Sequence, residues 1–181
     1  MKRLALFGLV LIIQLPLLLG IAQNKFKAIS GNISFFSSAP LEDIYADNNK
    51  IKSLLDIDSK EIAFIVSISE FNFKKSLMQT HFNEKYMESH KYPNALYQGK
   101  LISNSDLKTE GIHKVTSKGE ITIHGVKKEI EVTGTLHNKG REIQVKSEFN
   151  IKLADFKIKI PKLIIKNIAE EVLVKVDIVY Q

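Results

Sequence analysis

Strict alternation of apolar and polar side chains is the feature that most constrains how this chain folds. Residues 141–153 read REIQVKSEFNIKL, so that Ile, Val, Ser, Phe, Ile and Leu fall on one face while charged and amide side chains fall on the other. A period of two over a dozen residues indicates a β-strand with one buried face. Strands of ten or more residues are longer than usual, and they favour a closed barrel, which leaves no strand edge exposed.

The same pattern predicts about seven further strands, joined by short links. They cover residues 26–37, 50–57, 61–71, 95–104, 113–124, 129–137 and 171–181. Residues 58–60, 124–126 and 138–140 read as tight turns, two of them with a glycine that can adopt positive φ. Consecutive strands linked in this way run antiparallel. We therefore predict an all-β fold, an eight-stranded antiparallel barrel.

Residues 76–89 break this period and predict one inserted α-helix. Ser76 and Gln79 have the spacing of a capping box at its start. Met78, Phe82 and Tyr86 share one face, which we expect to pack on the barrel or to close it. The opposite, polar face carries His81, Glu84 and Glu88, and Pro93 ends the segment.

His81 and Glu84 also allow a metal-site hypothesis, with His90 as a third ligand. Imidazole and carboxylate groups at i and i+3 suit Zn²⁺ or Fe²⁺. The H-x-x-E pair occurs widely, however, and no H-E-x-x-H pattern accompanies it. We therefore favour a solvated helix face and keep a metal-dependent enzyme using His81 and Glu84 as an alternative.

The composition argues against several other functions. The chain contains no cysteine, which excludes thiol catalysis and disulfides. No G-x-S-x-G elbow or glycine-rich phosphate loop is present. His113, His124 and His137 fall at strand ends or turns, where we interpret them as turn and rim residues. The lysines are dispersed without an arginine cluster, so we predict neither nucleic-acid binding nor a cofactor.

The first 22 residues read as a secretory signal peptide. Lys2 and Arg3 precede an apolar run over residues 4–19, and Gly20 and Ala22 are the small residues that cleavage requires. An uncleaved anchor is the alternative, although the run is shorter than the roughly 20 residues of a membrane span. We therefore expect a periplasmic or secreted domain over residues 23–181, with 24 basic against 20 acidic residues.

Three segments, in order along the chain, resemble the YceI-like family. Residues 71–100 are similar to its strand, polar helix, K-Y-P and aromatic strand, here Lys91-Tyr92-Pro93 followed by Tyr97. GEITIHGVKKEIEV resembles its strand–turn–strand, and FNIKLADFKIKIP resembles its late strand with an aromatic residue, Phe156. The stretch FFSSAPLEDIYADNN resembles a Bacteroidetes-type branch of the family.

The resemblance implies an extended, lipocalin-like barrel that binds an isoprenoid or another long-chain lipid without catalysis. Two positions depart from the family pattern: Ala154 and Lys157 replace an arginine and a glycine near Phe156. Lys74 and Lys75 stand where relatives often have an arginine, and we interpret them as candidate head-group contacts. The candidate lining residues are Phe64, Val66, Ile68, Phe73, Met78, Phe82, Tyr86, Tyr97, Ile121, Ile143, Val145, Phe149 and Val174.

Three further expectations complete this interpretation. The apolar side chains of residues 163–168 are expected to cover the barrel or its mouth. A lipid ligand also makes transient membrane contact an expectation. The composition leaves open whether the barrel is hollow, and a filled structural or interaction barrel remains a second alternative.

Overall fold

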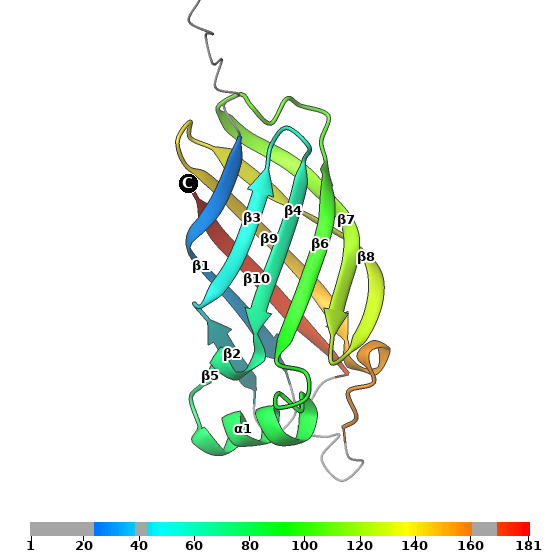
Figure 1. The fold of residues 1–181 in the computed structure, drawn as a ribbon. Helices are drawn as coiled ribbons and strands as arrows, with labels where there is room; N and C mark the ends of the chain where they lie inside the picture. Colours follow the sequence, from blue (N-terminus) through cyan, green and yellow to red (C-terminus); the bar gives the residue numbers. More distant parts are fainter. Residues whose placement is uncertain (1–23, 39–42, 161–169) are drawn as a thin grey trace, which may run out of the picture.

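The computed structural model describes residues 24–38, 43–160 and 170–181 and shows a barrel with one helix across its end (Figure 1). The predicted signal peptide and the apolar residues 163–168 lie outside the described residues. The strands are β1 (Lys25–Ser37), β2 (Ile44–Asn48), β3 (Ile51–Asp56), β4 (Glu61–Ser67), β5 (Asn72–Phe73), β6 (Asn94–Ile102), β7 (Gly111–Ile123), β8 (Val126–Asn138), β9 (Ile143–Lys152) and β10 (Glu171–Tyr180).

Eight of these strands form a closed antiparallel barrel, which confirms the predicted all-β, lipocalin-like fold. The order is β10-β9-β8-β7-β6-β4-β3-β1, and β1 pairs with β10 to close the ring. The sequence pattern missed β2 and β5, which are five and two residues long. The N-terminal part of β1 pairs with β3 and its C-terminal part with β2, which in turn pairs with β5.

Turn chemistry fixes the register of the longest hairpin. His124 and Gly125 join β7 to β8 with φ of 51° and 72°, as a two-residue turn with two positive φ angles requires. The resulting ladder covers both strands completely, from Ile123 opposite Val126 to Gly111 opposite Asn138. The predicted turn at 124–126 is therefore confirmed, and it brings the alternating apolar residues of both strands to the inside of the barrel.

The pairing between β8 and β9 is shorter than either strand. Their ladder joins Gly134–Asn138 to Ile143–Ser147 and ends there. The Ser147 hydroxyl donates to the Thr133 carbonyl at 2.7 Å, at the point where the two strands part. Beyond this point β9 runs into a short 3₁₀ turn, Leu153–Phe156, which lies at the same end of the barrel as the helix (Figure 1).

The helix differs from the prediction in its start and its winding. We call α1 (Ser76–His81) together with the π-helical turn Phe82–Tyr86 the end helix. Lys75 is its N-cap, and this described start has no side-chain cap hydrogen bond, so the predicted Ser76 capping box is wrong. Among the described helical segments, none has the length and apolar character needed to cross a bilayer.

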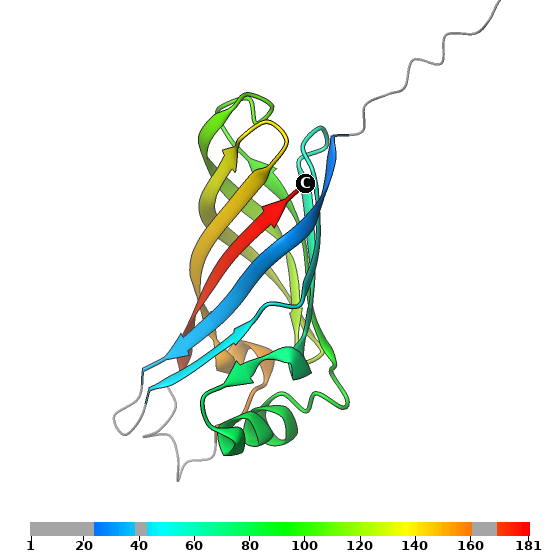
Figure 2. The same cartoon turned by 90° about the vertical axis from the view of Figure 1, so that its left-hand side faces the viewer.

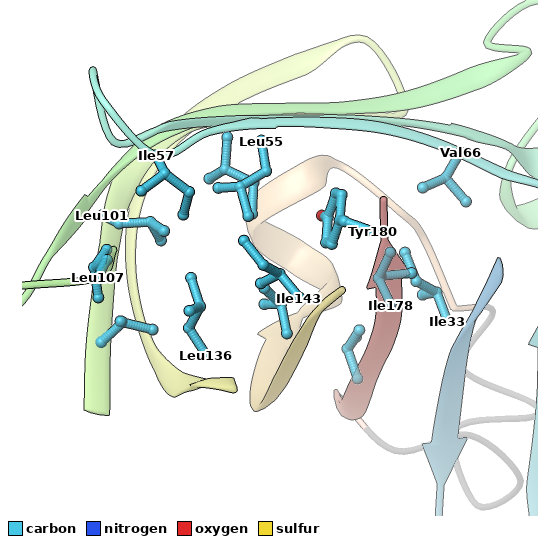
Figure 3. Close-up of a cluster of buried hydrophobic side chains, with 14 of the residues drawn as sticks. Ile33, Leu55, Ile57, Val66, Leu101, Leu107, Leu136, Ile143, Ile178 and Tyr180 are labelled. Atoms are coloured by element: carbon cyan, nitrogen blue, oxygen red, sulfur yellow. The ribbon is translucent and has the colours of Figure 1, made fainter. Parts of the chain in front are cut away.

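The barrel end opposite the end helix is filled with side chains, which we call the plug (Figure 3). Its fully buried large side chains are Leu55, Leu107, Leu136, Ile143, Ile178 and Tyr180. Leu107 comes from the loop between β6 and β7, and the buried Asn138 side chain donates to its carbonyl at 2.9 Å. His113 holds the same loop, because its ring bonds the Ser105 hydroxyl and the Thr109 carbonyl, each at 2.8 Å. This histidine is a buried structural residue and not the rim residue that we expected.

One polar contact crosses the plug. The Tyr180 hydroxyl lies 2.7 Å from the Ser53 hydroxyl, which donates to the Ala63 carbonyl at 2.7 Å. Burial raises the pKa of Tyr180 well above its ordinary value, so the phenol stays neutral. The bond connects β10 to β3 across the intervening β1 and so fixes the packing of the closed end.

Replacement of Tyr180 by phenylalanine tests this contact. We expect Tyr180→Phe to lower the free energy of unfolding by about 1 kcal/mol, because one buried hydrogen bond is lost while Ser53 keeps its carbonyl acceptor. Urea denaturation measures the change. Tyr45→Phe is the matched control, since Tyr45 is 54% exposed on the outer wall, and equal effects of the two changes would contradict the assignment.

Candidate functional site: an apolar cavity beneath the end helix

A cavity of about 490 Å³ lies between the plug and the end helix. Its wall is built from the inward faces of β1, β4 and β6 to β10, and the end helix and the segments around it cover the mouth. The lining is almost entirely aliphatic and aromatic. A volume of this size falls within the range of small-molecule sites, and an apolar wall selects an apolar occupant.

The structure places twelve of the thirteen predicted lining residues on this cavity. They are Phe64, Val66, Ile68, Phe73, Met78, Phe82, Tyr86, Tyr97, Ile121, Val145, Phe149 and Val174. Ile143 does not line the cavity, because it lies at the start of β9, one inward position before Val145, and is buried in the plug. Alternation shows that a side chain points inward, but not whether it meets a void or a packed core. That these residues bind a ligand stays a prediction.

Four phenylalanines gather at the mouth of the cavity. Phe35 on β1 lies 5.4, 5.8 and 5.5 Å, centroid to centroid, from Phe71, Phe73 and Phe82. The Phe73 and Phe82 rings are 4.9 Å apart. Such tilted and stacked contacts contribute about 0.5–1.5 kcal/mol per pair beyond area burial. The end helix is thus attached to the barrel through Phe82, on the face where the sequence placed the Met78, Phe82 and Tyr86 stripe.

Sequence reasoning missed Phe35 and Phe71 as cavity residues. Phe35 lies inside the predicted strand 26–37 at the same parity as Ile33, which was the available signal, but the adjacent Phe36 interrupts the alternation. Phe71 follows the short 3₁₀ turn Ile68–Glu70, which interrupts the period of two after β4. An irregular turn changes the direction of the following side chain, so no periodicity in the sequence identifies it.

A second buried cluster covers the mouth from the other side. It combines Met87 from the exit of the end helix, Ile123 from β7, and Phe156 and Ile158 from the end of β9. Three of these four, Met87, Ile123 and Ile158, also line the cavity. Val126 and Ile130 of β8 and Ile151 of β9 pack against this cluster, which therefore contacts both strands beyond the point where their pairing ends.

Few polar groups reach the wall, and the two tyrosines among them are neutral. The Tyr97 hydroxyl lies 2.6 Å from the Ser117 hydroxyl, and burial raises the pKa of Tyr97 despite this bond. Burial also raises the pKa of Tyr86. The polar lining is otherwise mainly serine and threonine, which can hydrogen-bond but carry no charge.

His124 ties the exit of the end helix to the barrel, and its side chain is only 10% exposed. Its Nδ1 lies 3.1 Å from the Phe156 carbonyl, and its Nε2 lies 2.9 Å from the Glu88 carboxylate. Both partners are acceptors, so both bonds form together only when the ring is an imidazolium. The Tyr92 ring covers it edge to face at 4.6 Å. We call His124, Glu88, Tyr92 and the Phe156 carbonyl the clasp.

The backbone around the clasp is held in an unfavourable conformation. Glu88, His124 and Lys157 have φ of 43°, 51° and 57°, in the left-handed region. Each such residue costs roughly 1 kcal/mol or more unless its surroundings fix it. The hydrogen bonds of the clasp and the packing of Phe156 offset this cost.

The residues of the metal hypothesis do not come together as that hypothesis requires. His81 lines the cavity and so lies away from the polar face on which we placed it, while Glu84 and His90 are exposed. His81 follows Met78 by three residues, and i, i+3 neighbours share a face of a helix, so His81 lies beside the cavity-facing stripe while Glu84 falls in the π-helical turn that follows. Within the described ranges, no three His, Cys, Asp or Glu residues are grouped as metal ligands would be. Lys74 and Lys75 are exposed beside the start of the end helix, and a head-group contact there stays a prediction.

The clasp predicts an acid limit to the docking of the end helix. The hydrogen bond to His124 lowers the pKa of Glu88. The stabilisation of the docked end helix by this bond is therefore complete above the ordinary carboxyl pKa of about 4.3, and it is lost as the pH falls through the lower pKa of the folded state. We expect Glu88→Gln to speed hydrogen exchange of residues 76–92 near pH 7. The difference in exchange rate between Glu88→Gln and wild type, compared at the same pH, should disappear at acid pH.

Glu84→Gln, an exposed carboxylate in the same helix, is the control and should leave exchange unchanged. An effect of Glu88→Gln that persists after Glu88 has been protonated would contradict a role for its charge.

Comparisons with known proteins agree with this architecture. A polyisoprenoid-binding domain from Saccharophagus degradans superposes with a TM-score of 0.74 at 14% identity, covering 88% of this chain and 98% of that one. BcnA of Burkholderia cenocepacia gives 0.72 at 16% identity, with 82% and 95% covered. A YCEI protein of Campylobacter jejuni gives 0.56 at 16% identity, with 99% and 97% covered. Among curated proteins, none matches the sequence significantly. The model of the YceI-like domain matches residues 19–180, almost the whole chain, and the protein therefore belongs to the YceI-like family.

Proposed function

We propose that this protein is an exported carrier that holds the apolar chain of an isoprenoid or similar lipid in its barrel. The observation that carries the proposal is the cavity of about 490 Å³, whose wall is apolar from the plug to the phenylalanines of the mouth. Burial of a hydrocarbon contributes about 0.8 kcal/mol per methylene, so a long chain binds without a precise polar site. Serine, threonine and neutral tyrosine groups on the wall accept an apolar chain more readily than fixed charges would.

Two kinds of support come from related proteins. A neighbour with the same fold is described as a polyisoprenoid-binding domain, and the chain belongs to the same family of barrels. At 14% identity, the shared fold alone does not show that the two proteins bind the same ligand. The cavity of this chain therefore carries the proposal, and polyisoprenoids are the class of ligand to test first.

The alternatives are less well supported by the geometry. A filled structural barrel would require the space beneath the end helix to be packed, and it is open. A metal-dependent enzyme would require ligands around His81, which instead faces apolar side chains such as Phe82 and Met78 on the cavity wall. Binding without catalysis is thus the reading that the described residues favour.

Export, location and branch remain part of the proposal. The basic and apolar N-terminal residues support export to the periplasm or the medium. A lipid carrier must also collect and deliver its cargo, which makes transient membrane contact a consequence of the proposal. The assignment to a Bacteroidetes-type branch stays a prediction from residues 35–49.

A cavity-filling substitution tests the proposed function. Ala95 on β6 lines the cavity, and we expect Ala95→Phe to weaken binding of farnesol at least tenfold, because the new ring occupies the space for the chain. Displacement of the fluorescent probe N-phenyl-1-naphthylamine from delipidated protein measures the affinity. Native mass spectrometry of the purified protein would show any lipid that it carries.

Ala63→Phe is the matched control. Ala63 lies on the neighbouring strand β4, between the inward residues Ile62 and Phe64, so its side chain points to the outer wall. This variant should bind farnesol as wild type does. If wild-type protein bound neither the probe nor farnesol, the proposed function would be wrong.

A further inference from the structure

The plug and the cavity meet at a sharp boundary inside the barrel. On β8, β9 and β10 the inward residues line the cavity up to one position, and the next inward residue is fully buried in the plug. The pairs, with the last lining residue first, are Gly134 and Leu136, Val145 and Ile143, and Val176 and Ile178. Three neighbouring strands thus change from cavity wall to packed core, one row deeper on β9 than on β8 and β10.

The strand register shows which side chains close the bottom of the cavity, which we call the floor. Val145 lies opposite Leu136 on one side and opposite Ile178 on the other, so the three side chains form one row. Ile178 also reaches across Gly31 on β1, because a Cβ at Gly31 would lie only 2.4 Å from the Ile178 Cδ1. The glycine therefore makes room for the isoleucine, whose side chain continues the row onto β1.

The side of the floor that faces the plug is packed, so Leu136 and Ile178 have little space to move. The loop between β6 and β7 is held through its backbone, because the Asn138 side chain donates to the Leu107 carbonyl. The neighbouring Lys108 forms an ion pair with Asp58 at 2.6 Å, which fastens the loop to the turn between β3 and β4. A close-packed interior of this kind resists a longer ligand, since its side chains have no empty space to enter.

We propose that Leu136 and Ile178 are specificity-determining residues, which limit the enclosed part of the ligand to on the order of fifteen carbon atoms. The estimate follows from the cavity volume of about 490 Å³, with a methylene group taking about the 30 Å³ that a water molecule occupies in the liquid. The inference rests on the proposed function, and it adds a chain length to the class of ligand. Carbon atoms beyond this number remain outside the mouth and add no burial.

A series of prenyl alcohols tests the limit in the wild-type protein. Displacement of N-phenyl-1-naphthylamine by geraniol, farnesol and geranylgeraniol compares two, three and four isoprene units. Affinity should rise steeply from geraniol to farnesol, by up to about fourfold per buried methylene, and then become nearly constant. A rise of equal steepness from farnesol to geranylgeraniol would overturn the floor. Absence of binding by all three would instead overturn the proposed function.

Two leucine variants locate the floor. Leu136→Ala should open space next to Val145, so that geranylgeraniol binds at least tenfold more tightly than farnesol. Leu107→Ala removes the same atoms from an equally buried leucine of the plug that is not opposite a lining residue, and it should keep the wild-type length dependence. A loss of stability alone would weaken both alcohols equally in both variants, and that result would count against the assignment of Leu136.

A filling variant avoids dependence on a destabilised core. Val145 lies between Leu136 and Ile178 in the floor row and lines the cavity, so Val145→Phe places extra atoms in open space and not in the plug. The steep part of the length series should then end at geraniol, one isoprene unit earlier than in wild type. If farnesol still bound more tightly than geraniol by the wild-type factor, the floor would not set the chain length.

Discussion

The pairing of β1 with β10 is the constraint on which the rest of the molecule depends. It joins the first and last strands through eight register pairs, from Ala28–Tyr180 to Phe36–Leu173, and turns an open sheet into a ring. In a closed ring every inward side chain points at the same axis, so alternation along each strand becomes a continuous interior. Without this closure the apolar faces would need another layer to cover them.

The interior then divides according to side-chain volume and loop structure. At one end, large aliphatic residues and Tyr180 meet across the axis, and the loop that carries Leu107 closes the top (Figures 1 and 3). Toward the other end, small residues such as Ser117 and Ala95 leave the axis open, and the end helix spans the gap with Phe82. Both views show the end helix lying across one end of the barrel (Figures 1 and 2). The closed end supplies stability, and the other end supplies a space for a ligand.

The two buried histidines illustrate how similar residues acquire different tasks. His113 faces one hydroxyl and one carbonyl, so a neutral ring satisfies both bonds and the residue simply holds a loop. His124 faces a carboxylate and a carbonyl, so its two bonds require the charged ring. The two bonds of His124, to Glu88 and to the Phe156 carbonyl, connect the end helix to the turn between β7 and β8 and to the end of β9. The cover of the cavity is therefore held by a polar contact as well as by packing.

The sequence by itself determined the barrel, its antiparallel hairpins, the single helix and most of the inward-facing residues. These features depend on local rules: a period of two, turn residues with positive φ, and a stripe of apolar residues along a helix. Only the tertiary structure decided where the cavity ends, because Val145 and Ile143 look alike in sequence and differ only in what lies across the barrel from them. It also decided that His124 meets Glu88 and Phe156, since contacts between residues 32 or more positions apart leave no periodic signal.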